Sequence, residues 1–535
     1  MIQRPAASPR GVLAALAATD HKRTALRVGA SSLIWFVLAG LLALIMRSEL
    51  ARPGMQVVSH DEYDQIFTLH GSLMIYGVLT PLAVAVGVYL VPLMVGAAEI
   101  AAPRVCLLGS WLIPLGAGAM VLGLATANGG GRAGWTAFTP LSNAAYTPGV
   151  GMDLWIAGVL LTTLGTLLLI IPVALTVLRL RTPGMTLLRL PVFCWSMLAT
   201  AMMALTAFPV LVVTMALLEW DRRLDGSIFS SSGGPIAYQN LFWFYGHPVV
   251  YIMFFPFVGM VAEVIATCSQ RRFFGYRLMV FSLLAFAALS MSVWGHHMFT
   301  TGRIPNRFFA LASTLIVIPA GIEYFDLLGT MWGGRIRLHT SMLFAVGFLV
   351  QFLVGGLTGL VLASPPLDYH VHDSYFVVAH FHYTLFAGSL FALLAGVYHW
   401  FPKVTGRLLS ERLGKLGFWV LVAGTNLTFM PMFVLGYRGM ARRIADYPAN
   451  AGFTGLNAAA TAGSFLIGIG VLLFLANIAW SLGRGAIAGD DPWGGQTLEW
   501  ATSSPPPRLN FERPLPPVHS PAPLFDLREV EVGAG

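Results

Sequence analysis

The chain has 535 residues, 56% of them hydrophobic and only 10% charged, and its mean hydropathy is +0.72. A soluble protein carries about 25% charged residues, so this composition excludes a soluble globular chain and indicates a polytopic membrane protein. The net charge of +8 would suggest nucleic-acid binding in a soluble protein. Here the cations fall in short loops and are explained by membrane topology, so no nucleic-acid partner is expected.

Residues 1–26 are polar and basic, and they lack the apolar region and cleavage site of a removable signal peptide. Twelve apolar runs follow, each long enough to cross a bilayer as a helix. They lie near residues 28–46, 66–96, 105–127, 153–178, 190–218, 238–267, 278–300, 308–330, 340–363, 375–401, 416–437 and 455–482. We therefore predict an all-α integral membrane protein with twelve transmembrane helices, located in the cell (inner) membrane.

Charge alternates between the two sides of the predicted bundle. One side holds Lys22, Arg23, Arg27, Arg179, Arg181, Arg189, Arg271, Arg272, Arg277, Arg335, Arg337, Lys403, Arg407, Arg412 and Lys415. The positive-inside rule makes this side cytoplasmic and places both termini there. Three units are expected: a cytoplasmic segment at 1–26, a twelve-helix membrane domain at 27–482, and a Pro-rich cytoplasmic tail at 483–535 without a core of its own.

Six of the thirteen histidines lie inside predicted spans, namely His70, His247, His296, His297, His380 and His382. A single histidine in a membrane helix usually makes an interhelical hydrogen bond. Six in a charge-poor bundle are harder to explain in that way, because each needs its own partner in lipid. Imidazole is a common ligand of copper and haem iron, so the set indicates metal centres.

The spacing divides the six histidines into groups. His380 and His382 are two residues apart and point about 200° away from each other on a helix. One helix would therefore present an imidazole to each of two flanking cofactors, with Phe381 near the line between them. His70, on the second predicted helix, remains to pair across the bundle with His382 or His380.

A second group points to a copper site. His296 and His297 are adjacent, about 100° apart on a helix, so both can reach one point at its edge. Together with His247 they would supply three nitrogens, which suits copper with an open position for a small ligand. Tyr251 lies one turn after His247 on the same face.

Three motifs together resemble the signatures of subunit I of the haem–copper oxidase superfamily. They are Gly246-His247-Pro248-Val249-Val250-Tyr251, Trp294-Gly295-His296-His297-Met298-Phe299, and the stretch from His372-Asp373 to His380-Phe381-His382-Tyr383. Leu69-His70-Gly71, Asp20-His21-Lys22 and Arg442-Arg443 fit the same family. The resemblance covers about residues 18–482.

The resemblance implies two haems, of type a, b or o, and one copper ion called copper B. His70 and His382 would be the axial ligands of a low-spin haem, and His380 the proximal ligand of a high-spin haem. The copper would be held by His247, His296 and His297. Tyr251 resembles the tyrosine that the family cross-links to the first copper histidine.

The same resemblance assigns roles to charged residues on the outer side. Arg442 and Arg443 match a pair that binds haem propionates, although two membrane-surface anchors would look the same. Trp135 and Asp368 match positions near the propionates, and Arg47 matches an arginine at the edge of the low-spin haem. His372 and Asp373 match ligands of a structural magnesium ion at the interface with subunit II; the alternative is a polar loop end without metal.

The activity implied is that of a terminal oxidase, which reduces dioxygen to water with electrons from cytochrome c or quinol. Tyr251 would give one electron and a proton, and the low-spin haem would feed electrons to the site. The partners implied are a copper-containing subunit II and other small membrane subunits. A nitric oxide reductase on the same scaffold is the alternative, disfavoured by Tyr251. A twelve-helix transporter with a histidine proton relay fits the paired histidines poorly.

The residues that handle protons depart from the family pattern. The common helix 6 motif has Glu where this chain has Val249, and Tyr245 replaces the usual Phe. Glu99 stands for the Asp at the usual entry, but the path beyond it is apolar, for example at Val88 and Leu168.

On the eighth predicted helix, Glu323 takes the place of the family's Lys. We hypothesise that Glu323, helped by Asp326 and Tyr251, carries protons to the site, because an intramembrane carboxylate is a functional candidate by default. A buried protonated Glu bonded to a neighbour is the structural alternative. Proton pumping is doubtful on this pattern.

Overall fold

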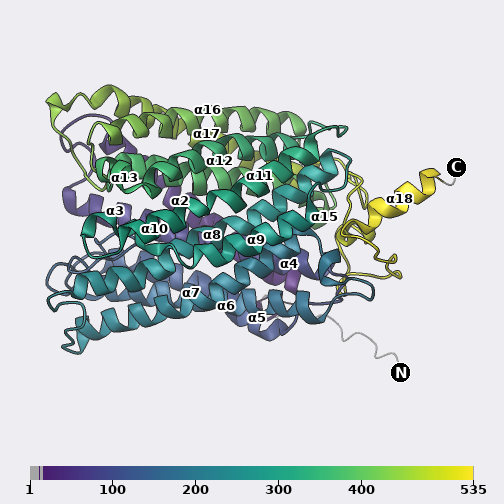
Figure 1. Cartoon of the computed structure of the whole chain (residues 1–535), viewed down its shortest axis with the longest axis horizontal. Helices are drawn as coiled ribbons and strands as arrows, with labels where there is room; N and C mark the ends of the chain where they lie inside the picture. The colour runs from purple at the N-terminus through teal and green to yellow at the C-terminus, as the bar shows by residue number, and fades with distance from the viewer. Residues whose placement is uncertain (1–10, 12–15, 534–535) are drawn as a thin grey trace.

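The computed structural model describes residues 11 and 16–533, with the side chains of 531–533 left aside. Twelve helices in this part are long and apolar enough to cross a membrane, and they run side by side (Figure 1). Apart from two isolated bridges, the described residues contain no strand. The predicted all-α fold with twelve spans is confirmed.

Eight spans are single helices: α2 His21–Glu49, α5 Pro103–Leu122, α6 Val150–Arg179, α7 Val192–Arg223, α8 Gly234–Cys268, α12 Thr340–Ala363, α16 Glu411–Tyr437 and α17 Thr454–Arg484. The other four are composite: α3 His60–Ser72 with η1 Leu73–Leu79 and α4 Thr80–Met94; α9 Tyr276–Ser290 with η4 Trp294–Thr301; α10 Asn306–Leu315 with α11 Val317–Met331; and α14 Tyr375–Phe381 with η5 His382–Ser389 and α15 Leu390–Thr405. A short helix, α13 Pro365–Val371, precedes α14.

The predicted segment at 1–26 is only partly described, because residues 1–10 and 12–15 lie outside the described part. Within it α2 already begins at His21, and Asp20 caps the helix by accepting from the backbone N–H groups of Lys22 and Arg23. An Asp at this position satisfies N–H groups that have no partner within the helix. The helix is therefore longer than its apolar stretch.

Glycines set the close contact between α5 and α6. A Cβ atom on Gly109 would stand 2.6 Å from the carbonyl oxygen of Gly165, and one on Gly116 would stand 2.6 Å from that of Gly158. Helices in membranes pack by such close backbone approach. The pairs lie seven residues apart on both helices, so one glycine face of each helix forms the contact.

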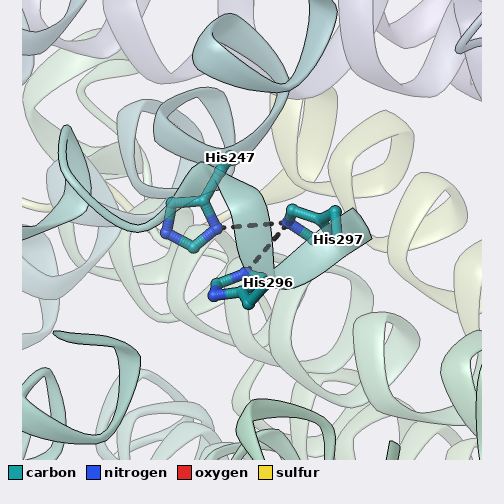
Figure 2. Close-up of side chains that lie close together, drawn as sticks. All are labelled: His247, His296 and His297. Atoms are coloured by element: carbon teal, nitrogen blue, oxygen red, sulfur yellow. Dashed lines mark hydrogen bonds between the residues drawn. The ribbon is translucent and has the colours of Figure 1, made fainter. Parts of the chain in front are cut away.

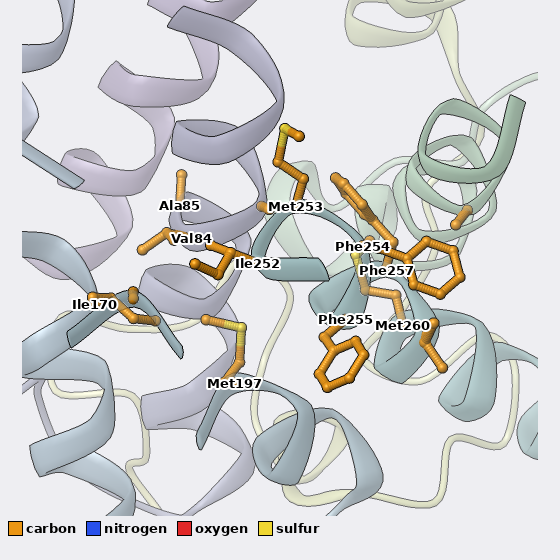
Figure 3. Close-up of a cluster of buried hydrophobic side chains, with 14 of the residues drawn as sticks. Val84, Ala85, Ile170, Met197, Ile252, Met253, Phe254, Phe255, Phe257 and Met260 are labelled. Carbon is orange, nitrogen blue, oxygen red and sulfur yellow. The ribbon is translucent and has the colours of Figure 1, made fainter. Parts of the chain in front are cut away.

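Helix α8 lies at the centre of the bundle. Of the residues in its most hydrophobic stretch, 89% are buried. Figure 3 shows Phe254, Phe255, Phe257 and Met260 of this helix in a cluster of buried apolar side chains. A helix that is apolar all round belongs in the interior. The polar residues that α8 does carry, including His247 and Tyr251, are therefore held inside the molecule.

Residues 485–533 are largely irregular and contain two short helices, η7 Leu498–Ala501 and α18 Pro523–Gly533. Most of this segment lies against one end of the bundle, which we call the tail end, whereas α18 projects away from it (Figure 1). The side-chain oxygen of Asn510 accepts from Lys22 Nζ at 2.9 Å, and its amide nitrogen donates to the Ala97 carbonyl at 2.8 Å. The start of α2 and the tail thus meet at the tail end.

Candidate haem and copper site

One cavity of about 1580 Å³ runs through the bundle and is lined by all six histidines that the sequence places in spans. Small-molecule sites are usually about 300–1,000 Å³, so the space is large enough for more than one ligand. Most other predicted site residues also line it: Tyr251, Phe381, Trp135, Asp368, His372, Asp373, Arg47, Arg442 and Arg443.

Three of the histidines converge on one point (Figure 2). His247 Nδ1 lies 3.2 Å from His297 Nε2, and His296 Nε2 lies 3.1 Å from the same nitrogen. One nitrogen of each ring lies within 4.8 Å of the others, and no second group of this kind occurs among the described residues. Ring nitrogens at these separations can share one ion at an imidazole–metal distance near about 2 Å, so the set fits a copper ion.

Neighbouring side chains fix the three rings. Ser313 of α10 lies with its hydroxyl 2.7 Å from His296 Nδ1, and Trp243 stacks on His297 with ring centroids 3.9 Å apart. Such partners orient metal-binding imidazoles. His247 Nε2 is buried and has no hydrogen-bond partner in the described part of the chain. Tyr251 is beside this ring, with centroids 4.8 Å apart.

The other three histidines each commit Nδ1 to a backbone carbonyl. The distances are 2.8 Å from His70 to Ala39, 3.0 Å from His380 to Gly355 and 2.8 Å from His382 to Val378. A carbonyl oxygen only accepts, so each Nδ1 must carry the hydrogen. The lone pair is then on Nε2, the atom available to an iron. The residues therefore fit axial haem ligation.

The loops at the end opposite the tail bring the predicted charged residues together. Residues Ser374 and Ala441 pair as an isolated bridge, and the backbone N–H of Arg442 donates to Asp373 O at 3.0 Å. Arg442 also forms an ion pair with the Asp373 carboxylate. Burial opposes ionisation of Asp373, but Arg442, His372 and Arg443 more than offset it and hold its pKa below the usual value.

Two further contacts complete this cluster. His372 Nδ1 lies 2.8 Å from a carboxylate oxygen of Asp368, and burial raises the pKa of Asp368. Arg443 donates to Thr136 Oγ1 at 3.3 Å. Burial, with the charge of Arg442, lowers the pKa of Arg443 to about 9. Buried cations such as Arg443 favour an anionic partner, for example a carboxylate.

Arg47 reaches the cavity from α2. Its Nη2 donates to Asn457 Oδ1 at 2.9 Å, whereas its buried Nε and Nη1 have no hydrogen-bond partner in the described part of the chain. A buried donor without a partner is costly. The guanidinium therefore fits a site whose ligand carries an acceptor at this edge.

Glu323 stands apart from these groups. It is 4% exposed, lies on α11 and does not line the cavity, whereas Ala320, Gly321 and Tyr324 of the same helix do. No hydrogen bond between the described residues joins Glu323 to Tyr251 or Asp326, and Glu323 Oε1 and Asp326 Oδ2 lack partners. Asp326 is packed against the loop residue Gly275, where a Cβ would stand 2.1 Å from its Oδ1.

Sequence reasoning missed the groups that orient the histidines. Ala39, Gly355 and Val378 act through backbone carbonyls, which every residue has, so no sequence signal marks them. Ser313 and Trp243 are ordinary residues of apolar helices. Only the packing of α10 and α8 against η4 shows that these two contact His296 and His297.

Comparison with known proteins agrees with this geometry. Residues 23–466 match the family described as "Cytochrome C and Quinol oxidase polypeptide I". The chain is 49% identical over 512 residues to the probable cytochrome c oxidase subunit 1-beta of Nocardia farcinica, covering 95% of this chain and 87% of that one. It is 47% identical to cytochrome c oxidase subunit 1 of Corynebacterium diphtheriae, covering 96% and 91%.

A solved structure described as a heme-copper terminal oxidase dimer has the same fold, with a TM-score of 0.75 at 20% identity, over 96% of this chain and 90% of that one. The chain therefore belongs to the cytochrome c and quinol oxidase polypeptide I family, and it is the catalytic, multi-pass subunit of a haem–copper terminal oxidase of the cell membrane.

Proposed function

We propose that this subunit reduces dioxygen to water in the cavity, between a high-spin haem held by His380 and a copper ion held by His247, His296 and His297. The observation that supports this best is the convergence of three imidazole nitrogens in a cavity that His380 also lines. His297 Nε2 is 3.1–3.2 Å from the other two nitrogens, and all three are within 4.8 Å of one another. When bound, the metals supply electrons and the position for dioxygen. The protein's residues orient the ligands and deliver protons.

The low-spin haem is assigned to His70 and His382, whose Nδ1 hydrogens are both committed to carbonyls. Arg442 and Arg443 would hold the propionates with Trp135 and Asp368 nearby, and the unpartnered nitrogens of Arg47 would bind a polar group at the haem edge.

We also propose that the low-spin haem carries a long isoprenoid chain, as haems of types a and o do and type b does not. The cavity continues as an apolar groove between α2 and α17, lined by Gly29, Leu33, Leu41, Val471 and Ile478 among others. Arg47 and Gly29 are 18 residues apart on α2, which is about 27 Å along a helix. Extraction of the pigment and its mass would test this assignment.

We assign Tyr251 the role of donating one electron and one proton. Its ring lies beside His247, and His247 Nε2 is the ring atom left free by the copper set. That arrangement suits the cross-link implied by the family resemblance. A cross-linked peptide containing both residues, found by mass spectrometry after proteolysis, would support it.

We assign the proton route to α11, with Glu323 as the residue that carries protons to the cavity. Glu323 is buried on a helix whose adjacent face, at Ala320, Gly321 and Tyr324, lines the cavity, and Asp326 lies one turn closer to the loop at Gly275. In the orientation that the positive-inside rule gives, the tail end faces the cytoplasm. Proton pumping is not part of this proposal.

Partner assignments follow from the same cluster. We propose subunit II at the end opposite the tail, where His372 and Asp373 could hold magnesium at the interface, and cytochrome c as the donor, since the relatives are named cytochrome c oxidases. Quinol remains the competing donor. Other small membrane subunits would cover the remaining outer faces.

The test is gas consumption by the purified complex, supplied in turn with dioxygen and nitric oxide, with reduced cytochrome c and then quinol. Consumption of four electrons per dioxygen with cytochrome c is expected. Turnover of nitric oxide but not dioxygen would overturn the proposal in favour of a nitric oxide reductase, a function for which Tyr251 has no need.

A further inference from the structure

Two buried carboxylates at the tail end are used by none of the chemistry above. Glu263 lies near the end of α8 and is 8% exposed, and Glu499 lies in the tail and is fully buried. The first belongs to the helix that carries His247 and Tyr251. The second comes from a segment 236 residues later in the chain.

Several contacts bring the two carboxylates to one place. Gln496 donates to the carbonyl of Ala266 at 3.0 Å, so the tail crosses α8 one turn beyond Glu263. Glu263 Oε1 accepts from the backbone N–H of Phe193 at 3.2 Å, and Glu499 Oε1 accepts from Trp400 Nε1 at 3.1 Å. The rings of Phe193 and Trp400 are 6.5 Å apart, and the two carboxylates interact electrostatically.

Neither carboxylate forms a direct ion pair among the described residues, although Lys403 attracts Glu499 electrostatically. Lys403 is the cation of this region, but its ammonium donates to the carbonyls of Asp490 at 3.0 Å and Thr502 at 2.7 Å and lies over the Trp500 ring. Glu499 Oε2 is buried and has no partner in the described part of the chain.

The other titratable groups near the pair come from α7, α9, α15 and the tail. They are Cys194 of α7, Tyr276 of α9, His399 and Lys403 of α15, and Asp490 and Asp491 of the tail. Lys403 is the cation among them, and the two aspartates add negative charge near Lys403. Burial raises the pKa of Glu499.

Two buried carboxylates that interact electrostatically cannot both be ionised without a cost. A single proton on either carboxyl removes that cost, because only one negative charge is then left in the pair. We propose that Glu263 and Glu499 form a proton-binding site that holds one exchangeable proton between them and fastens the tail to α8.

The site has a definite pH dependence. A carboxyl whose pKa is higher in the docked tail than in the released tail favours docking at low pH, and this contribution falls as the pH rises. Above the upper titration of the pair, both groups are ionised and repel across the contact between tail and bundle. The tail is then held by Gln496 and the other contacts alone.

Infrared difference spectra of the purified complex, recorded between neutral and alkaline pH, test the site without requiring turnover. We expect a carboxylic-acid band that shifts in D2O and disappears at high pH. In Glu263→Gln and in Glu499→Gln alike, repulsion is gone, so the band should titrate at least about one pH unit lower or vanish. Glu219→Gln, at the opposite end and beside Arg222 and Arg223, is the matched control and should leave it unchanged.

If only one of the two substitutions alters the band, Glu263 and Glu499 are independent acids and the shared site is wrong. If neither does, the pair holds no proton. A buried variant can lose its packing. Tail release is therefore also measured in the unaltered complex, as tryptic cleavage after Arg508 at a series of pH values. Cleavage that accelerates with pH supports the fastening role, and a flat profile overturns it.

Discussion

The histidine cavity and the carboxylates of α11 are both buried polar regions, but the protein supports them differently. His70, His380 and His382 each have a backbone carbonyl on Nδ1, and His296 has the Ser313 hydroxyl. Glu323 and Asp326 keep unpartnered oxygens in the described part of the chain. The imidazoles are therefore held in fixed orientations by the chain itself, whereas the carboxyl group of Glu323 is free to gain, lose or redirect a proton.

This difference teaches where each function resides. Ligand geometry is determined by short contacts within one chain, so its loss should be abrupt and specific. In the proposed route, proton delivery depends on the protonation state of Glu323, which has few fixed contacts, so substitution of Glu323 should spare the pigments. Four substitutions test that distinction, from the largest expected effect to the smallest.

His380→Ala should reduce turnover to background. The substitution removes the only predicted protein ligand of the high-spin haem, whereas His70 and His382 remain for the other haem. Optical spectra should therefore lose the high-spin signal and keep the low-spin one. His382→Ala is the control and should give the reverse pattern. Equal loss of both signals in both variants would contradict separate haems on the two faces of this helix.

Glu323→Gln should lower turnover by about 10²-fold or more, the usual contribution of a proton-transferring side chain. Gln keeps the size of the side chain but cannot exchange a proton, so optical spectra of the haems should not change. Oxygen uptake and proton uptake are measured together. Glu323→Asp, which retains a carboxyl, should recover part of the rate. Unchanged uptake in Glu323→Gln would exclude the α11 route.

Ser313→Ala should weaken copper retention by about 10–100-fold, the usual cost of losing a group that orients a metal ligand. The hydroxyl lies 2.7 Å from His296 Nδ1, on the side away from the three-nitrogen point. Copper content per haem is measured after dialysis against a chelator. The matched control is Thr314→Val, since that hydroxyl bonds Ala310 within its own helix. Equal copper in both variants would contradict the role of Ser313.

Gly359→Ala should change turnover by only a few-fold. An added Cβ would stand 3.1 Å from His380 Cε1, so the ring must tilt slightly while its Nδ1 contact remains. A small shift of the high-spin spectrum is expected. Gly356→Ala, where a Cβ meets nothing within 4 Å, should show none. A shift in the control alone would contradict this packing account.

Much of this organisation follows from local patterns in the sequence. The spans are long apolar runs, and the spacing of the paired histidines indicates which ligands share a span. The helical geometry is only approximate, because His296 and His297 lie in the 3-10 stretch η4 and His382 begins the π-helical stretch η5. Long-range relations do not follow in that way. That Ala39 on α2 accepts from His70 on α3, or that Ser313 contacts His296, depends on how helices pack, and no spacing within either segment encodes it.

Two local details also escape the pattern. The second and tenth spans read as continuous helices, yet each contains a π-helical stretch, Leu73–Leu79 and His382–Ser389, next to a predicted haem ligand. Such stretches have no composition of their own and often occur at functional sites. The tail is polar and Pro-rich, as disordered segments are, but Leu498 and Trp500 are buried against the bundle.

The contact of Asn510 with the start of α2 has a consequence for biosynthesis. Lys22 is 9% exposed and has its ammonium bound to the side chain and nearby backbone of residues that leave the ribosome almost 500 residues later. Before the last segment is translated, the ammonium of Lys22 can pair with Asp20, 3.5 Å away, but it lacks the two bonds to the tail. A polypeptide truncated before Arg508 would leave those two bonds unmade, a local difference between incomplete and finished subunits.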